Sequence, residues 1–194
     1  MRRKTLDILL TTGGVVVAAV LLISGLLLTW GHNFATDEVN SQLSAQKIFF
    51  PKAGSEQLND PKVKPYIEQY AGQQLTTGDQ AKAFADHYIK VHLDESTGGR
   101  TYSELSTQSR QNPGDAELAG LVQTAFRGET LRGMLLNAYA WDTMGKIAWY
   151  ASIAAYAGAA LMLLLSILGF VHLRRVSPDA EVFVGNRPAE KVIA

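Results

Sequence analysis

Any catalytic or metal chemistry in this sequence would have to come from its histidines and carboxylates, because the chain contains no cysteine. Among the four histidines, His87 and His92 lie close together in sequence, and Asp86, Asp94 and Glu95 surround them. Two histidines and one carboxylate form the ligand set of a non-haem iron site. On a helix, however, a separation of five residues turns the second side chain by about 140°, so we predict that the two imidazoles point apart. We therefore interpret them as polar residues at the margin of an amphipathic helix.

The sequence contains no recognisable catalytic motif. It has no Gly-x-Ser-x-Gly elbow, no Walker loop, no dinucleotide fingerprint and no His-Glu-x-x-His zinc motif. The lack of cysteine excludes disulfides, thiolate zinc sites and c-type haem attachment. His172 lies at the end of an apolar run, and we interpret it as an interfacial residue. We expect a protein that is not an enzyme and that binds no cofactor or metal.

Two apolar runs dominate the elements that would position such residues. One covers residues 8–29 without an ionisable or amide side chain, and the other covers residues 147–173. At about 1.5 Å per residue the first run reaches roughly 33 Å, close to the ~30 Å thickness of the hydrocarbon layer. It is longer than the apolar core of a cleaved secretory signal, which has about 7–15 residues. The sequence therefore predicts two transmembrane helices, the first an uncleaved anchor.

Basic residues near the ends of the runs predict the orientation. Arg2, Arg3 and Lys4 precede the first run, while Arg174 and Arg175 follow the second. Since cytoplasmic flanks carry an excess of basic residues, both termini are expected in the cytoplasm and the central segment outside the plasma membrane. An aromatic belt at the outer interface agrees with this topology. The belt consists of Trp30, Trp141, Trp149 and Tyr150.

We therefore predict an all-α membrane protein in which two transmembrane helices flank a small extracytoplasmic helical domain. Its segments are a cytoplasmic N-terminus (1–7), transmembrane helices (8–29 and 147–173), the extracytoplasmic domain (30–146) and a cytoplasmic tail (174–194). The 18 basic and 18 acidic side chains balance, but residues 31–146 hold 11 basic against 14 acidic ones. A chain without a basic excess is not expected to bind nucleic acid.

Local signals predict helices in the central segment. Thr77 with Gln80, and Thr101 with Glu104, have the spacing of capping boxes. Stop signals follow them, at Gly98-Gly99 and at Asn112-Pro113-Gly114. The chain is expected to be extended before Pro51. Further predicted helix starts are Thr36, Pro61, Pro65 and Asp115.

The helix that begins at Asp115 is expected to be long. Its apolar residues recur with helical spacing as far as Tyr139. We expect Gly128 and Gly133 to bend or break it. The part near Trp141 is predicted to lie along the membrane surface before the chain turns into the second run.

Small residues recur at helical spacing in both apolar runs. Such faces let helix backbones approach closely and drive association in membranes. The two runs can use them to pack on each other or to dock on a larger protein, and different faces can serve both purposes. The residues are Gly14, Ala18, Ala151, Ala154, Ala155, Gly158 and Ala159.

Three parts of the chain resemble a family of two-span actinobacterial membrane proteins of mostly unknown function. They are residues 27–34 (LLTWGHNF), residues 70–74 with 78–83 (YAGQQ and GDQAKA), and residues 126–139 (FRGETLRGMLLNAY). The resemblance covers roughly residues 5–175. Some members carry the label of aromatic ring-opening dioxygenase, a chemistry that needs an iron site which this sequence does not offer. The chain is also similar in size and topology to the associated factor of the actinobacterial cytochrome bcc–aa3 respiratory supercomplex.

Two hypotheses for the function follow. In the first, the chain is a non-catalytic accessory subunit that contacts other membrane subunits and lipids, and the resemblance implies a respiratory supercomplex as the assembly. In the second, the outer domain is an anchored module that binds a ligand or senses the envelope. The short tail without a recognisable output domain favours the first hypothesis.

Overall fold

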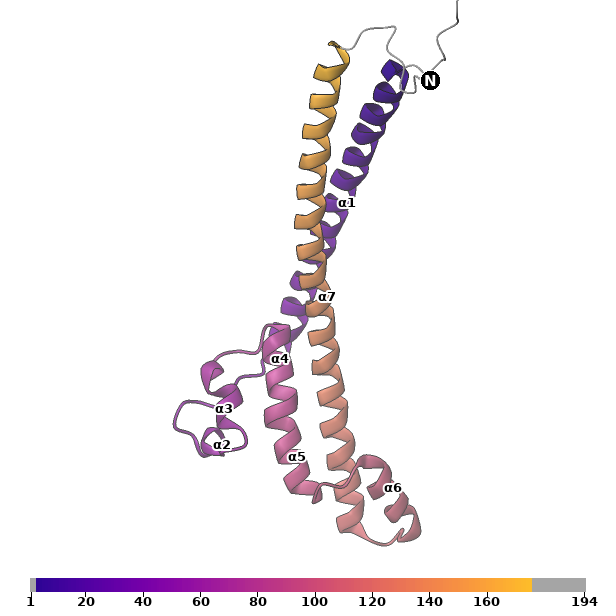
Figure 1. The fold of residues 1–194 in the computed structure, drawn as a ribbon. Helices are drawn as coiled ribbons and strands as arrows, with labels where there is room; N and C mark the ends of the chain where they lie inside the picture. The colour runs from indigo at the N-terminus through magenta and orange to yellow at the C-terminus, as the bar shows by residue number, and fades with distance from the viewer. Residues whose placement is uncertain (1–2, 176–194) are drawn as a thin grey trace, which may run out of the picture. The chain divides into compact units, whose positions relative to one another are not determined.

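The computed structural model describes residues 3–175, and within them every regular element is helical (Figure 1). The described residues contain no strand, and a single antiparallel bridge joins Phe49 to Gln74. The all-α prediction is therefore confirmed. The predictions for Arg2 and for the tail after Arg175 fall outside the described residues. The elements are α1 (Arg3–Gln46), α2 (Glu56–Asn59), α3 (Lys64–Ile67), η1 (Glu68–Tyr70), α4 (Gly78–Phe84), η2 (Ala85–Ile89), α5 (Lys90–Thr97), α6 (Tyr102–Gln111) and α7 (Ala116–Leu173).

The described chain forms two compact units. The first, which we call the paired-helix unit, takes the described parts of Met1–Trp30 and Trp149–Ala194. The second, the central unit, is Gly31–Ala148. Helices α1 and α7 each contribute one part to each unit.

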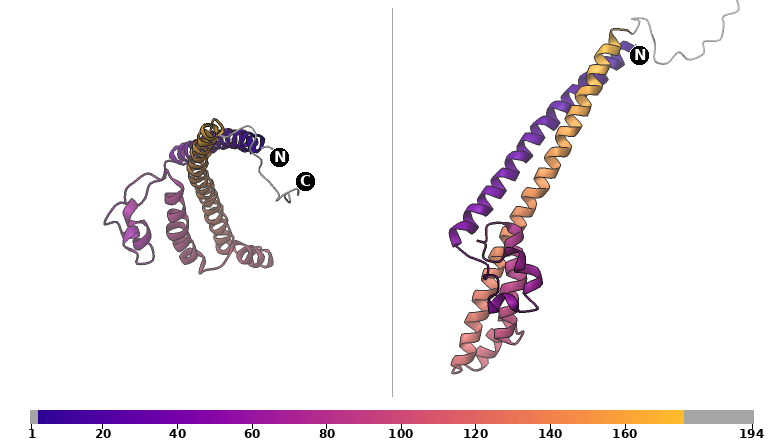
Figure 2. Two further views of the ribbon diagram at one scale, coloured as in Figure 1. Left: turned by 45° about the horizontal axis from the view of Figure 1, so that its top comes forward. Right: turned by 90° about the vertical axis from the view of Figure 1, so that its left-hand side faces the viewer.

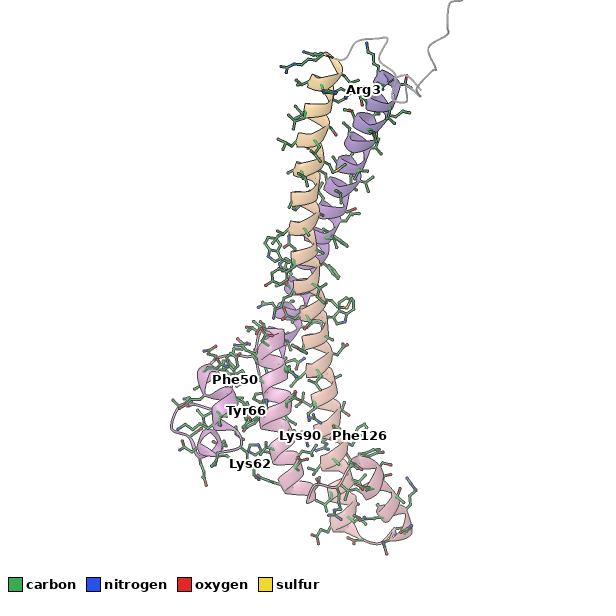
Figure 3. The ribbon with its side chains drawn as sticks, in the orientation of Figure 1. Arg3, Phe50, Lys62, Tyr66, Lys90 and Phe126 are labelled. Atoms are coloured by element: carbon green, nitrogen blue, oxygen red, sulfur yellow. The ribbon has the colours of Figure 1, made fainter. Side chains whose placement is uncertain are left out.

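Both α1 and α7 are long and apolar enough to cross a membrane. In their most apolar stretches only 17% and 11% of the residues are buried. A core helix of a soluble protein would bury most of such a stretch, whereas these helices carry apolar side chains all round. Figure 3 shows these side chains as carbon-rich sticks projecting from both helices. The prediction of two helices of this kind is confirmed.

In the paired-helix unit, α1 and α7 approach closely where a hydroxyl side chain of one helix faces a glycine of the other. A Cβ added to Gly14 would collide with the Ser166 hydroxyl, and one added to Gly169 would collide with the Thr11 hydroxyl. Because the two contacts are reciprocal, they set the antiparallel register of the pair. Glycine is required here for close approach.

The close contact between α1 and α7, which we call the seam, continues toward the other end of the paired-helix unit. A Cβ on Gly25 would lie 2.6 Å from the ring of Tyr156, so this ring packs closely against the α1 backbone. The Tyr156 hydroxyl is 3.0 Å from the Thr29 hydroxyl, which itself donates to the carbonyl of Gly25 at 2.9 Å. The tyrosine thus has a hydrogen-bond partner at its polar tip, as a part-buried phenol requires.

The central unit is built around a helix run made of α4, η2 and α5, which lies beside α7 (Figures 1 and 2). Both predicted capping boxes are present, at Thr77 with Gln80 and at Thr101 with Glu104. Gly98 ends α5 in the left-handed region, at φ 62°. The core between these elements is apolar and includes Leu43, Phe50, Leu58, Val63, Ile67, Leu75, Phe84 and Leu135.

Four local predictions about the central unit hold. Pro65 lies in the first turn of α3, and the chain before Pro51 is not helical. The Asp115 carboxylate accepts a hydrogen bond from the Leu118 amide at 2.9 Å at the start of α7. The Asn112-Pro113-Gly114 stop also holds, since α6 ends at Gln111.

Two predicted helix starts are wrong. Thr36 lies inside α1, which is unbroken to Gln46. This stretch has no proline, a glycine such as Gly31 costs only about 1 kcal/mol in a helix, and a buried stripe of Ala35, Val39 and Leu43 stabilises it. Pro61 lies in a turn after α2, where the Asp60 carboxylate accepts from the Lys62 amide at 2.7 Å.

The predicted interruptions of the last helix are also wrong. Helix α7 passes Gly128, Gly133 and Trp141 without a break, so no separate surface helix precedes the second apolar run. A Cβ on Gly128 would lie 2.8 Å from Leu93 of α5. This glycine therefore serves close packing between the two helices, which offsets its low helix propensity.

The close approach of Gly14 and Ser166 predicts a specific cross-link between α1 and α7. The chain has no native cysteine, so two introduced cysteines can pair only with each other. A Cβ on Gly14 would lie 3.8 Å from the Cβ of Ser166, within the spacing that disulfides need. The double variant Gly14→Cys with Ser166→Cys should form an intramolecular disulfide under mild oxidation, seen as a mobility shift on non-reducing gels. The matched pair Gly13→Cys with Ser166→Cys should remain unlinked, because Gly13 has no neighbour within 4 Å. Equal linkage of both pairs would contradict this register.

Candidate functional site

The two histidines near each other in sequence have separate partners in the structure. His87, in the π-helical segment η2, stacks on Tyr66 of α3, with 3.7 Å between the ring centroids. Tyr66 is labelled in Figure 3. His92 lies 2.7 Å, at Nδ1, from the carbonyl of Tyr88, one turn earlier. Within residues 3–175 no group of three histidine or acidic side chains could hold a metal ion.

Asp86 takes part in an ion-pair network that anchors η2 to α7. Its carboxylate lies 3.1 Å from Lys82 and 3.3 Å from Arg132. Burial alone would raise the pKa of Asp86, but hydrogen bonds and charges from Lys82 and Arg132 lower it below the usual value of 3.8. The stabilisation from this carboxylate is therefore present above pH 3.8 and is lost as the pH falls through the lowered pKa.

Arg132 is the centre of that network. Its side chain is 16% exposed and donates three hydrogen bonds, to the Ala85 carbonyl at 3.1 Å, to Asp86 at 3.3 Å and to Glu129 at 2.9 Å. The planar guanidinium matches this set of acceptors. One side chain of α7 thus holds the first residues of the π-helical segment in place.

A buried carboxylate of α7 lies against the start of α4. Asp142 of α7 is 7% exposed, and a Cβ on Gly78 would collide with it. Lys146 lies between two carboxylates, 2.9 Å from Asp142 and 2.7 Å from Asp79. Burial alone would lower the pKa of Lys146, but its hydrogen bonds to the carboxylates of Asp142 and Asp79, together with their negative charges, raise it to about 12. The ammonium therefore stays charged, and its contribution to stability is lost only as the pH rises through 12.

The main candidate site in the central unit is an apolar groove between α1 and α7. It has a volume of about 590 Å³. Its walls include Val39 and Leu43 of the core, and its mouth carries the exposed side chains of Phe34, Met134 and Trp141. A cluster of large exposed apolar side chains commonly marks an interaction site.

The polar rim of the groove is acidic and neutral. It consists of Glu38, Gln42, Gln46 and Asn137, with no basic residue among the lining side chains. The Gln42 amide donates to the Glu38 carboxylate at 2.6 Å. Within the described chain Glu38 has no ion pair. The groove is therefore suited to an apolar occupant with neutral or basic polar groups.

The small residues singled out in the sequence take different places in the paired-helix unit. Gly14, Ala18, Ala155 and Ala159 are buried, and Gly158 approaches Leu21. Ala151 is half-buried and Ala154 is exposed. Most of these small residues thus serve packing within the chain, while the exposed Ala154 remains available to an outside partner.

The four aromatic residues of the predicted belt are all exposed. Trp30, Trp149 and Tyr150 belong to the paired-helix unit, and Trp141 belongs to the central unit. In Trp141 the exposed fraction is 50%, and this side chain also lines the groove.

Sequence reasoning missed the Asp142 cluster and the groove. The spacing of Asp142 and Lys146, four residues apart on a helix, signals one ion pair, but nothing in the sequence joins them to Asp79. Likewise the groove combines residues from two helices almost a hundred positions apart. Comparison with known proteins adds no further site, since no family model, no curated protein and no solved structure matches this chain.

Gly78→Ala tests the close contact at the start of α4. The added methyl collides with Asp142, so the free energy of unfolding should fall by about 1–3 kcal/mol. The control Gly120→Ala lies in α7 with nothing within 4 Å of the added Cβ. It should raise the free energy of unfolding by about 0.5–1 kcal/mol. Urea unfolding of the purified chain in detergent measures both, and a neutral Gly78→Ala would contradict the contact.

Arg132→Ala tests the anchor of the π-helical segment. It leaves Asp86 and the Ala85 carbonyl without their partner and should lower stability by about 1–3 kcal/mol. Hydrogen exchange should rise most at the amides of residues 85–90. Arg127→Ala is the matched control, because Arg127 is exposed on the same helix and should change stability by less than about 0.5 kcal/mol. Equal effects of the two variants would argue against the anchor.

Proposed function

We propose that this chain is an accessory subunit of a larger membrane complex, that it has no catalytic role and that it supports the assembly or stability of the complex. The observation that carries the proposal is the apolar groove of the central unit, with Phe34, Met134 and Trp141 exposed at its mouth. A monomeric domain rarely leaves such a cluster in water. A helix of a partner subunit that places its apolar face in the groove would cover these side chains.

The proposed location is the plasma membrane, with α1 and α7 as the two spanning helices. Two helices that are long and apolar enough to cross a membrane support this. The basic residues Arg3, Lys4, Arg174 and Arg175 support cytoplasmic termini, which would place the central unit outside the cell membrane. The exposed tryptophans and Tyr150 would then form the outer aromatic belt.

The proposed assembly is a respiratory one, the cytochrome bcc–aa3 oxidase supercomplex. This part of the proposal is supported by the similarity in size and topology to the associated factor of that supercomplex. The partners would be respiratory membrane subunits and the lipids between them.

Extraction in mild detergent tests the proposal. The tagged chain should migrate in a high-molecular-weight assembly together with respiratory subunits. Recovery of the chain solely as a free monomer or homodimer would contradict the accessory role. Recovery in a large assembly without respiratory subunits would contradict only the respiratory assignment.

A pair of matched variants tests the groove itself. Met134→Lys places a charge at the mouth of the groove, where it would face the apolar side of the partner helix, and this should reduce the recovered assembly about tenfold or more. Met144→Lys is the control, because Met144 is similarly exposed on α7, at 61% against 63%, and does not line the groove. Unchanged recovery with Met134→Lys would show that the contact lies elsewhere.

A second candidate function is the binding of a small apolar ligand by the central unit. The volume of the groove, about 590 Å³, favours it because ligand pockets commonly measure roughly 300–1,000 Å³. In that case the chain would be recovered free of other subunits, with a small molecule bound that Met134→Lys releases. Mass spectrometry of the purified chain separates the two functions.

A further inference from the structure

A second cavity lies between α1 and α7 within the paired-helix unit. Its volume is about 320 Å³. Leu10, Met162 and Leu165 form its apolar walls, and polar groups of both helices also line it. The polar lining residues used below are Asp7, Thr11, Ser166 and His172.

Two oxygen atoms in this cavity are buried and have no hydrogen-bond partner within the described chain. They are Oδ2 of Asp7 and Oγ of Ser166. Ser166 is 4% exposed, so its hydroxyl is shielded from bulk water. The nearest basic group to Asp7 is Nε2 of His172, at 4.0 Å, which is beyond hydrogen-bond distance. Buried polar atoms of this kind call for a partner that the chain does not supply.

The polar groups are spaced along the seam. The Thr11 hydroxyl faces Gly169 one turn after Asp7, and the Ser166 hydroxyl faces Gly14 two turns after it. Seven residues of helix separate Asp7 from Gly14, which is about 10 Å. The cavity thus offers a carboxylate near the end of the apolar run and hydroxyl groups deeper in it.

Basic residues surround the carboxylate end. Arg3 and Lys4 lie on the Asp7 face of α1, one turn before it, and Arg174 and Arg175 follow His172. All four are exposed, and none forms an ion pair with another described residue. Asp7 therefore attracts a cation, while the surrounding residues attract an anion. A ligand that satisfies both is a zwitterion.

We propose that this cavity binds a bilayer lipid with a phosphoethanolamine headgroup. The ammonium donates to Asp7 Oδ2, the phosphate faces the basic residues, and an ester carbonyl accepts from the Ser166 hydroxyl. The acyl chains lie along Leu10, Met162 and Leu165. The order of the polar groups along the seam, carboxylate first and hydroxyl deeper, matches the order of headgroup and ester in such a lipid.

We assign the zwitterionic ligand to a membrane lipid because of the position of the cavity. Its lining runs from Asp7 and His172, near the ends of two helices that the proposed function places across the membrane. Headgroups are concentrated at that depth, and this inference rests on that part of the proposal. A choline headgroup lacks N–H donors for Asp7. A glycerol headgroup has no cation for it.

Lipid retention by the purified full-length chain tests the proposal. The chain is mixed in detergent with phosphatidylethanolamine, phosphatidylcholine or phosphatidylglycerol of identical acyl chains, and bound lipid is counted by native mass spectrometry. Phosphatidylethanolamine should be retained about tenfold better than the other two, because its charged N–H group donates to the buried Oδ2 of Asp7. Equal retention of the three lipids, or a preference for phosphatidylglycerol, would overturn the proposal.

Variants locate the contact. Asp7→Asn should abolish the preference for phosphatidylethanolamine, whereas Asp37→Asn, which changes an exposed carboxylate of the central unit, should keep it. Ser166→Ala should weaken retention of all three lipids alike, since each has the ester carbonyl. An unchanged preference in Asp7→Asn would overturn the site. The lipid comparison on the unmodified chain remains decisive if a variant fails to fold.

The experiments can contradict the lipid site and the accessory role independently of each other. Lipid retention is measured on the purified chain without partner subunits, so a failed co-purification leaves it unaffected. Release of the chain from membranes by alkaline carbonate would contradict the spanning helices themselves. Loss of headgroup preference in a chain that stays in the membrane would contradict only the lipid site.

Discussion

The close contact between α1 and α7 in the paired-helix unit is the constraint on which this structure depends. In a membrane, two apolar helices would gain little from a hydrophobic effect between them, so van der Waals packing would have to hold them together. The hydroxyls of Thr11 and Ser166 rest on Gly169 and Gly14, and any larger residue at either glycine would separate the backbones. The same contacts set the register and therefore place Asp7 beside His172.

In the central unit the two long helices meet again, with polar contacts added. The imidazole of His32 lies 2.9 Å, at Nδ1, from the Gly145 carbonyl, and Ala35 packs against the same glycine. Arg132 of α7 then donates to the π-helical segment at Ala85, and Asp142 packs against Gly78 at the start of α4. Because these groups are largely buried, each needs its partner, and the unit acquires a single arrangement of helices.

The groove and the lipid cavity arise from the same geometry with opposite chemistry. Both lie between α1 and α7, and each lies wholly within one unit. The groove has aromatic and thioether side chains at its mouth and suits an apolar helix. The cavity has a carboxylate oxygen and a hydroxyl that are buried without hydrogen-bond partners, and it suits a ligand that donates to the first and accepts from the second. Contacts with protein and with lipid would thus use different parts of one helix pair.

The sequence by itself determined the helical class, the two apolar helices and most local ends of elements. Capping boxes at Thr77 and Thr101 and the Gly98 stop act within one turn, so their residues suffice to predict them. Thr36, Gly128 and Gly133 were misjudged because weak local signals yield to packing along α1 and α7. The groove, the Asp142 cluster and the lipid cavity were decided only by tertiary structure. Each joins side chains from distant parts of the chain, and their proximity depends on the register of the packed helices.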